Sequence, residues 1–305
     1  MSADESAVPA FPAPLQVLFA TACGVMVANI YYAQPLIALI APDLGINEHT
    51  AGVVVTTAQL GYAAGLFLLT PLADIVENRR LVLSLAGLTI FALLGAALAR
   101  SSPLFLACSF VIGLGSTGAQ VLVPLSSLLA PPPIRGRVIG NIVAGLLAGI
   151  MLARPLASFV ASHWGWRAIF FLSAGMMTIM VALLARALPR RHPEPGPRYG
   201  SLLISIGWLF ADHPPLRRRT ICHALAFATF QLFWTAIPLA LADRLGLTQS
   251  GIALFALAGA GGALCAPLSG RLADMADTIS VMARDRARRS PWTRAVVRSS
   301  MRSRP

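Results

Sequence analysis

The sequence is poor in charge and contains no lysine. Charged residues make up 12% of its 305 residues and apolar residues 56%, against about 25% and about 45–50% in an ordinary soluble domain. So few charges cannot cover the surface of so apolar a globule, which excludes a soluble enzyme. The apolar residues form long runs and lack the short alternation of an outer-membrane barrel. The composition therefore predicts an all-α polytopic membrane protein.

Acidic residues are also scarce, with 12 against 24 arginines and a net charge of +12. A basic chain can bind nucleic acid, but these arginines lie between apolar runs and in the last 28 residues. Arginines in such places are typical of the cytoplasmic face of a membrane protein. We therefore expect the partner to be the lipid bilayer of a bacterial-type inner membrane, and no nucleic acid.

The four cysteines are far apart, and each lies inside an apolar run. No CxxC or Cys/His spacing is present, so neither a metal site nor a disulfide framework is indicated. HExxH, a serine–histidine pair within the apolar runs and paired carboxylates are also absent. We expect no catalytic residue, cofactor or metal.

Eight runs are long enough to span a membrane, which takes about 20 mostly apolar residues. The first run is not a cleavable signal, because residues 2–14 carry no arginine. Pro35 and Pro124 fall inside runs, which membrane helices tolerate. The predicted spans are 15–40, 50–73, 80–99, 103–130, 138–162, 166–188, 220–242 and 250–272.

The arginines predict the orientation of these spans. With a cytoplasmic N-terminus, the inside loops carry 11 arginines and the outside loops three. This bias favours cytoplasmic N- and C-termini. The one long connection, residues 189–219, holds six prolines and most of the inside charge. It predicts a cytoplasmic linker after a six-helix unit of residues 1–188.

An internal repeat relates the two sides of this linker. A loop with Leu-Gly precedes the second and the eighth span, and both spans end in Leu-Ala-Asp, at residues 72–74 and 272–274. Chance similarity of apolar helices is the alternative, but the matched ends argue against it. Parallel halves of this kind are typical of secondary transporters.

On these residues the chain resembles the major facilitator superfamily. That family has two six-helix halves, a long cytoplasmic loop between them, and a signature close to G-x-L-A-D-x-x-G-R-K after helix two. Thr70 and Glu77 stand here for its two glycines. The resemblance covers residues 15–277 and implies a gating role for Leu72, Ala73, Asp74, Arg79, Arg80, Gly270 and Asp274.

The Asp74 loop has a physical rationale for such a role. A carboxylate at a helix end, close to Arg79 and Arg80, can form a charge-assisted latch on the inside face. A solvated loop whose arginines only set the topology is the alternative. Glu77 is interpreted as ordinary charge balance.

The resemblance also exposes a deficit. Twelve helices and a linker need about 400 residues, and residues 220–277 supply only the first two helices of a second half. We therefore expect a truncated or frameshifted chain in which residues 278–305 are a non-native or disordered basic tail. A solvated native tail is the alternative.

Arg154 is the most informative single residue, because it lies well inside the fifth span. A charge there costs at least about 2.5 kcal/mol unless it meets water or a partner, and no acid lies in any predicted span. We expect it to face the bundle interior or a polar vestibule. Snorkelling to the outer interface and contact with a substrate or anion are the competing interpretations.

Other polar residues within spans are candidates for the central cavity by resemblance, although helix-to-helix hydrogen bonds explain each one equally well. Ser109 stands where drug/proton branches carry an arginine, and no spanning carboxylate offers itself as a proton carrier, so proton antiport is doubtful. The cavity candidates are Asn29, Tyr32, Gln34, Gln59, Gln120, Arg154, Gln231 and Trp234.

The sequence thus predicts a secondary transporter that moves a small molecule by alternating access, with efflux of a drug or metabolite and a coupling ion as expectations. Because a second half is incomplete, we expect this chain to transport poorly. An inactive remnant or a membrane interaction protein is the alternative, and a homodimer could rebuild a closed cavity.

Overall fold

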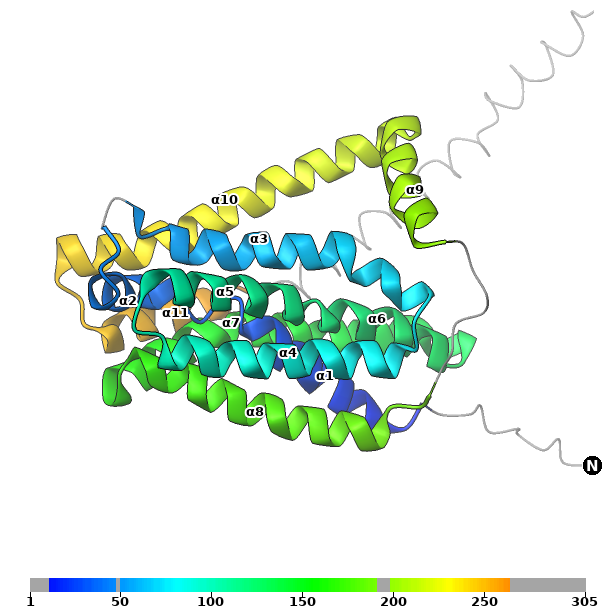
Figure 1. Ribbon diagram of the computed structural model, residues 1–305, viewed down its shortest axis with the longest axis horizontal. Coiled ribbons are helices and arrows are strands. Elements are labelled where there is room, and N and C mark those ends of the chain that lie inside the picture. The colour runs from blue at the N-terminus through cyan, green and yellow to red at the C-terminus, as the bar shows by residue number, and fades with distance from the viewer. Residues whose placement is uncertain (1–10, 48–49, 191–197, 264–305) are drawn as a thin grey trace, which may run out of the picture. The chain divides into compact units, whose positions relative to one another are not determined.

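The computed structural model describes residues 11–47, 50–190 and 198–263. Over these ranges the chain is helical and contains no strand (Figure 1), which confirms the predicted all-α fold. Residues 1–257 form one compact unit. Of a second unit, residues 258–305, the structure describes only 258–263.

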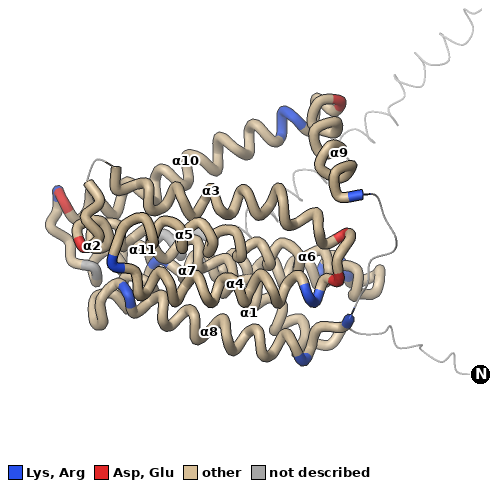
Figure 2. Tube along the Cα trace, in the orientation of Figure 1, with Lys and Arg blue, Asp and Glu red and all other residues tan. Residues whose placement is uncertain are grey.

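Six helical stretches in the described ranges are long and apolar enough to cross a membrane. They match six of the eight predicted spans to within a few residues, except that the fifth and the seventh begin six residues earlier. Figure 2 shows charged residues gathered toward the ends of these helices, as a bilayer requires. The stretches are α3 (Val53–Leu68) with η3 (Thr70–Asp74), α4 (Asn78–Leu98), α5 (Ser102–Ser116) with α6 (Gly118–Leu129), η4 (Pro132–Ile134) with α7 (Arg135–Trp164), α8 (Trp166–Ala187) and α10 (Pro214–Leu245).

The predicted first span, 15–40, is not one continuous helix. It divides into α1 (Ala13–Ala28), tight turns, η1 (Gln34–Leu36) and α2 (Ile37–Asp43). Pro35 has no N–H to give to a helical ladder, and its ring disfavours helical backbone before it. The turns are closed by shorter i→i−3 bonds, such as Tyr31 N–H to the Ala28 carbonyl at 2.9 Å. The break matters because it places Gln34 and its neighbours outside a regular helix.

Two further helices flank α10. Helix α9 (Tyr199–Asp212) lies inside the connection that the sequence predicts as a linker. Helix α11 (Gln249–Ala263) begins where the eighth span is predicted. Residues 264–272 of that span, Cys265 and the predicted tail 278–305 lie outside the described residues.

Glycines bring two pairs of helices into close contact. A Cβ atom added at Gly149 of α7 would lie 2.2 Å from the Gly24 carbonyl oxygen of α1. One added at Gly61 of α3 would lie 1.9 Å from the Phe110 carbonyl oxygen of α5. Small residues are how membrane helices gain contact area without a hydrophobic driving force between them. These seams hold α1 against α7 and α3 against α5.

Helix α10 is mostly exposed and has one buried residue, Pro238. It packs against η1 and α2. There Leu239 covers a small apolar cluster that includes Ile37 and Val55. The contact sets the face of α10 that meets the first six spans.

Candidate functional site

Arg154 lies in the second half of α7 with its side chain directed into the protein. Only 3% of the residue is exposed. Its Nε donates to Gln34 Oε1 at 3.0 Å, and its Nη1 donates to the Ile150 carbonyl at 3.3 Å. The break at Pro35 makes the first bond available, because η1 packs against both α7 and α10.

Three aromatic rings surround the same guanidinium. Its Cζ lies 4.8 Å from the centre of the Tyr31 ring, 5.2 Å from Phe230 and 4.4 Å from Trp234. Cation–π contacts offset part of the cost of burying a charge. Tyr31 comes from the turn after α1 and the other two from α10, so residues on both sides of the 189–213 connection enclose one arginine.

Two donors in this cluster have no acceptor in the described part of the chain. They are Nη2 of Arg154 and Nε2 of Gln34, both fully buried. Arginine only donates, so the bond from Arg154 fixes Oε1 as the end of the Gln34 amide that faces it and leaves Nε2 free. The two ion pairs that the structure records lie elsewhere, so the guanidinium has no carboxylate partner among the described residues.

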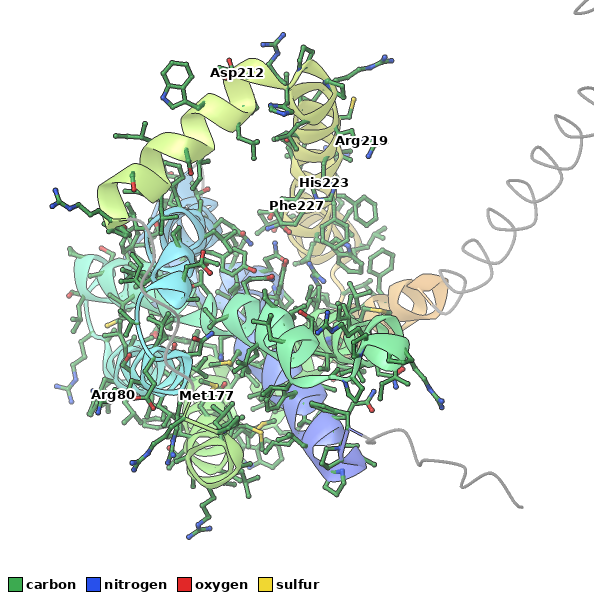
Figure 3. All side chains as sticks on the ribbon, turned by 90° about the vertical axis from the view of Figure 1, so that its right-hand side faces the viewer. Arg80, Met177, Asp212, Arg219, His223 and Phe227 are labelled. Atoms are coloured by element: carbon green, nitrogen blue, oxygen red, sulfur yellow. The ribbon has the colours of Figure 1, made fainter. Side chains whose placement is uncertain are left out.

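A groove of about 760 Å³ runs between α3 and α10. From α3 it is lined by Gln59 and Tyr62, and Gln59 Nε2 also lacks an acceptor among the described residues. From α10 it is lined by residues that include Arg219, His223 and Phe227, which follow one another along the helix (Figure 3).

Aromatic contacts connect the groove to the buried arginine. The ring of Phe227 stacks on Phe230, with centres 6.3 Å apart, and Phe230 in turn lies 6.4 Å from Trp234. Spacings of three and four residues place Phe227, Phe230 and Trp234 on one face of a helix. From Arg219 to Trp234 this face extends about 22 Å, at about 1.5 Å per residue.

The structure therefore brings together three of the cavity candidates, Gln34, Arg154 and Trp234, and places Gln59 in the groove. Gln231 lies on α10 three residues before Trp234, and its amide has no partner in the described residues. The sequence analysis did not single out Phe227, Phe230 or Arg219. Their spacing places them on one face of α10, which could have been noticed in the sequence. Aromatic residues are common on membrane-spanning helices, however, so the spacing alone does not indicate a binding site.

The remaining candidates lie elsewhere. Asn29 donates to the Val25 and Met26 carbonyls at 3.1 and 3.2 Å and accepts from the Ser173 hydroxyl, so it joins α1 to α8. Gln120 donates to Tyr62 Oη at 2.9 Å. Tyr32 is buried and lines a groove along the contact between α1 and α7.

The expected latch between Asp74 and the nearby arginines is not formed in this structure. Asp74 is exposed, and no ion pair is recorded for it among the described residues. Arg80 pairs instead with Glu77, at 2.9 Å, and Arg79 donates to the Ala185 carbonyl at the end of α8. Glu77 is the better partner because its backbone lies just before α4, one turn from Arg80. Leu72 and Ala73 are half-buried in η3, and Gly270 and Asp274 lie outside the described residues.

At the ends of the helices away from Asp74, Asp43 connects α2 to the start of α8. Its carboxylate accepts from Arg167 Nη1 at 2.5 Å and from Trp166 Nε1 at 3.1 Å. Arg167 also donates to the Ala99 carbonyl at 3.0 Å, so the end of α2, the end of α4 and the start of α8 meet here. The hydrogen bond from Arg167 holds the pKa of Asp43 below its usual value.

The fold and this site define a polytopic helical membrane protein that holds inside its bundle an arginine with no counter-ion among the described residues. The chain belongs to the major facilitator superfamily, whose family model matches residues 17–295. The match runs past residue 277, where the resemblance noted from the sequence ended.

Relatives with curated names are transporters. The chain is 42% identical over 228 residues to the uncharacterized transporter YgaY of Escherichia coli O157:H7, which covers 75% of this chain and 58% of YgaY. It is 27% identical over 257 residues to the purine ribonucleoside efflux pump NepI of Shigella sonnei, covering 84% of this chain and 63% of NepI. The chain thus spans about three fifths of the length of these relatives.

Solved structures share the fold. One is a bacterial homologue of the human lysosomal transporter Spinster in an inward-facing, unoccupied conformation, with a TM-score of 0.65 at 16% identity over 85% of this chain and 63% of that one. Another is a D-xylose–proton symporter, with a TM-score of 0.55 at 18% identity over 80% of this chain and 65% of that one.

Proposed function

We propose that the chain functions in secondary active transport of a small molecule, by alternating access across a bacterial-type inner membrane. Membership of the family and the names of the relatives support transport, and NepI supports the efflux direction. The observation that carries the proposal is the buried Arg154, enclosed by residues from α7, η1 and α10 and left with an unused donor.

In this proposal residues 1–188 are one half of the transporter, residues 189–219 the cytoplasmic connection, and residues 220–277 belong to the second half. Substrate reaches Arg154 along the groove between α3 and α10. Alternating access moves one half against the other around a site near the membrane midplane. The arginine bias of the loops supports cytoplasmic termini. The groove would then open toward the cytoplasm, because its Arg219 end belongs to the cytoplasmic connection.

Counterflow in proteoliposomes tests this without knowledge of the coupling ion. The purified 305-residue chain is reconstituted, the vesicles are loaded with an unlabelled probe, and uptake of the labelled probe is followed. Benzoate, inosine and tetraphenylphosphonium sample an anion, a neutral nucleoside and a cation. We expect weak but saturable counterflow of at least one probe, absent from empty vesicles, in keeping with the poor transport expected from the sequence.

Two variants make the result specific to the site. Arg154→Gln should abolish the flux, and Arg100→Gln, which changes an exposed arginine at a helix end, should leave it unchanged. If no probe shows counterflow, or if the flux is the same in the Arg154 variant, the proposal is wrong.

A further inference from the structure

The charges around the candidate path are all of one sign. Arg219 lines the groove between α3 and α10, and the contact of Phe227 with Phe230 connects this groove to Arg154. No carboxylate lines the groove, and none contacts Arg154 among the described residues. A cationic substrate would find no counter-charge along this path, whereas an anion would find Arg219 at one end and Arg154 at the other.

The unpaired hydrogen-bond donors at Arg154 also favour an anionic ligand. Nη2 of Arg154 and Nε2 of Gln34 are donors, they are buried, and they belong to side chains already joined at 3.0 Å. A donor buried without an acceptor is costly. Two such donors from adjacent groups match a carboxylate, which accepts through two oxygens.

The surroundings favour a flat ligand. Tyr31, Phe230 and Trp234 present three ring systems within 5.2 Å of the guanidinium carbon. Aromatic side chains pack well against planar groups through offset or edge contacts. Rings also exclude water, which strengthens an ion pair with the arginine.

We propose that the Arg154–Gln34 pair binds the carboxylate of a planar organic anion, whose ring lies against Trp234 and Phe230. This rests on the proposed transport function and adds the substrate class. The anion completes the partner set of Arg154, and Arg219 in the groove draws it in. A neutral purine ribonucleoside, the substrate class in the name of NepI, would leave the guanidinium without a counter-ion.

Binding to the purified full chain tests the charge preference apart from transport. Benzoate, benzamide and benzamidinium have nearly the same shape and carry negative, zero and positive charge. Cyclohexanecarboxylate keeps the carboxylate and loses the planar ring. Isothermal titration should show benzoate bound at least tenfold more tightly than any of the other three, and inosine should not compete with it.

Gln34→Glu is the decisive variant, because it places inside the protein the anion that the ligand is proposed to supply. We expect it to fold with a melting temperature equal to or above that of the parent chain and to lose at least tenfold in affinity for benzoate. Arg154→Gln should lose as much, Arg154→Lys should lose less, and Arg100→Gln should match the parent.

The inference is overturned if benzamide, benzamidinium, cyclohexanecarboxylate or inosine binds as tightly as benzoate, if none of the probes binds, or if Gln34→Glu binds benzoate as the parent does. Counterflow of another probe without benzoate binding would overturn the anion site and leave the transport proposal standing. Benzoate binding without any counterflow would overturn the transport proposal and leave the anion site standing.

Discussion

The contact between α1 and α7 gives a sharp prediction about a single methyl group. In Gly149→Ala, the new Cβ would lie 2.2 Å from the Gly24 carbonyl oxygen and 2.4 Å from Gly24 Cα. Both are backbone atoms, so no side chain can rotate away. Because ordinary contacts begin at about 3.4 Å, the helices must separate by about 1 Å. The same change at Gly140, on the same helix, meets nothing within 4 Å.

The two substitutions should therefore change stability in opposite directions. Alanine is a better helix former than glycine by about 1 kcal/mol, and Gly140→Ala should gain up to that amount. Gly149→Ala has the same gain but forces overpacking, which typically costs about 1–3 kcal/mol. It also loses dispersion contacts along the seam as the helices move apart. We expect Gly149→Ala to be less stable than Gly140→Ala by about 1–3 kcal/mol.

Cys23 provides a local assay, because it is completely buried next to Gly24 on α1. Thermal unfolding gives the stability difference, and the rate of maleimide modification of Cys23, read by mass spectrometry, reports loosening of the packing around α1. Modification should be faster in Gly149→Ala than in the parent and unchanged in Gly140→Ala. Equal stability and equal modification rates in the two variants would refute the close packing of α1 on α7.

Two further predictions concern the ends of the helices. Asp43 has its pKa lowered by Arg167, so the pair stabilises the fold above the ordinary carboxyl pKa of about 3.9, and this contribution is lost as the pH falls through the lower folded value. The pair is partly exposed, so at most about 1 kcal/mol is involved. The melting temperature of Asp43→Asn should fall less than that of the parent between pH 6 and pH 3, and identical pH dependence would contradict the role of the pair. Arg79→Gln should lower the melting temperature in circular dichroism more than Arg100→Gln does, because Arg79 satisfies a carbonyl in the last turn of α8. Equal melting temperatures would show that this bond adds no stability.

Most of the helical architecture could be predicted from hydropathy, because a bilayer imposes length and composition on each span. Two departures are helix α9, which lies in the predicted linker, and the first span. Proline is tolerated in many membrane helices, and Pro124 does lie inside α6. Between Ala28 and Ile37, around Pro35, the chain instead leaves the α-helix. The sequence alone does not distinguish the two cases, because the outcome depends on whether neighbouring helices accept the turn.

The buried charge of the candidate site, Arg154, could be predicted from the sequence, but the residues that surround it could not. The cost of a charge inside a span singles out Arg154 without any structure. Which rings cover it depends on how α10 docks, and Leu239, through which α10 contacts α2, has no distinctive sequence signal. Similarly, the spacing of Asp74, Glu77 and Arg80 permits several ion pairs, and only the backbone between η3 and α4 selects Glu77.

The contacts of Arg154 also bear on how a ligand could be coupled to movement. Among the described residues of α10, the guanidinium contacts the rings of Phe230 and Trp234. Such contacts are worth about 0.5–2 kcal/mol each, less than a buried charge-assisted hydrogen bond. The proposed carboxylate would therefore compete successfully with the rings for the arginine. If the proposed ligand binds, it would exchange a direct contact between α7 and α10 for one through the ligand. An arginine whose role was only to fasten α10 would do better with a carboxylate on that helix, and among the described residues α10 offers none near it.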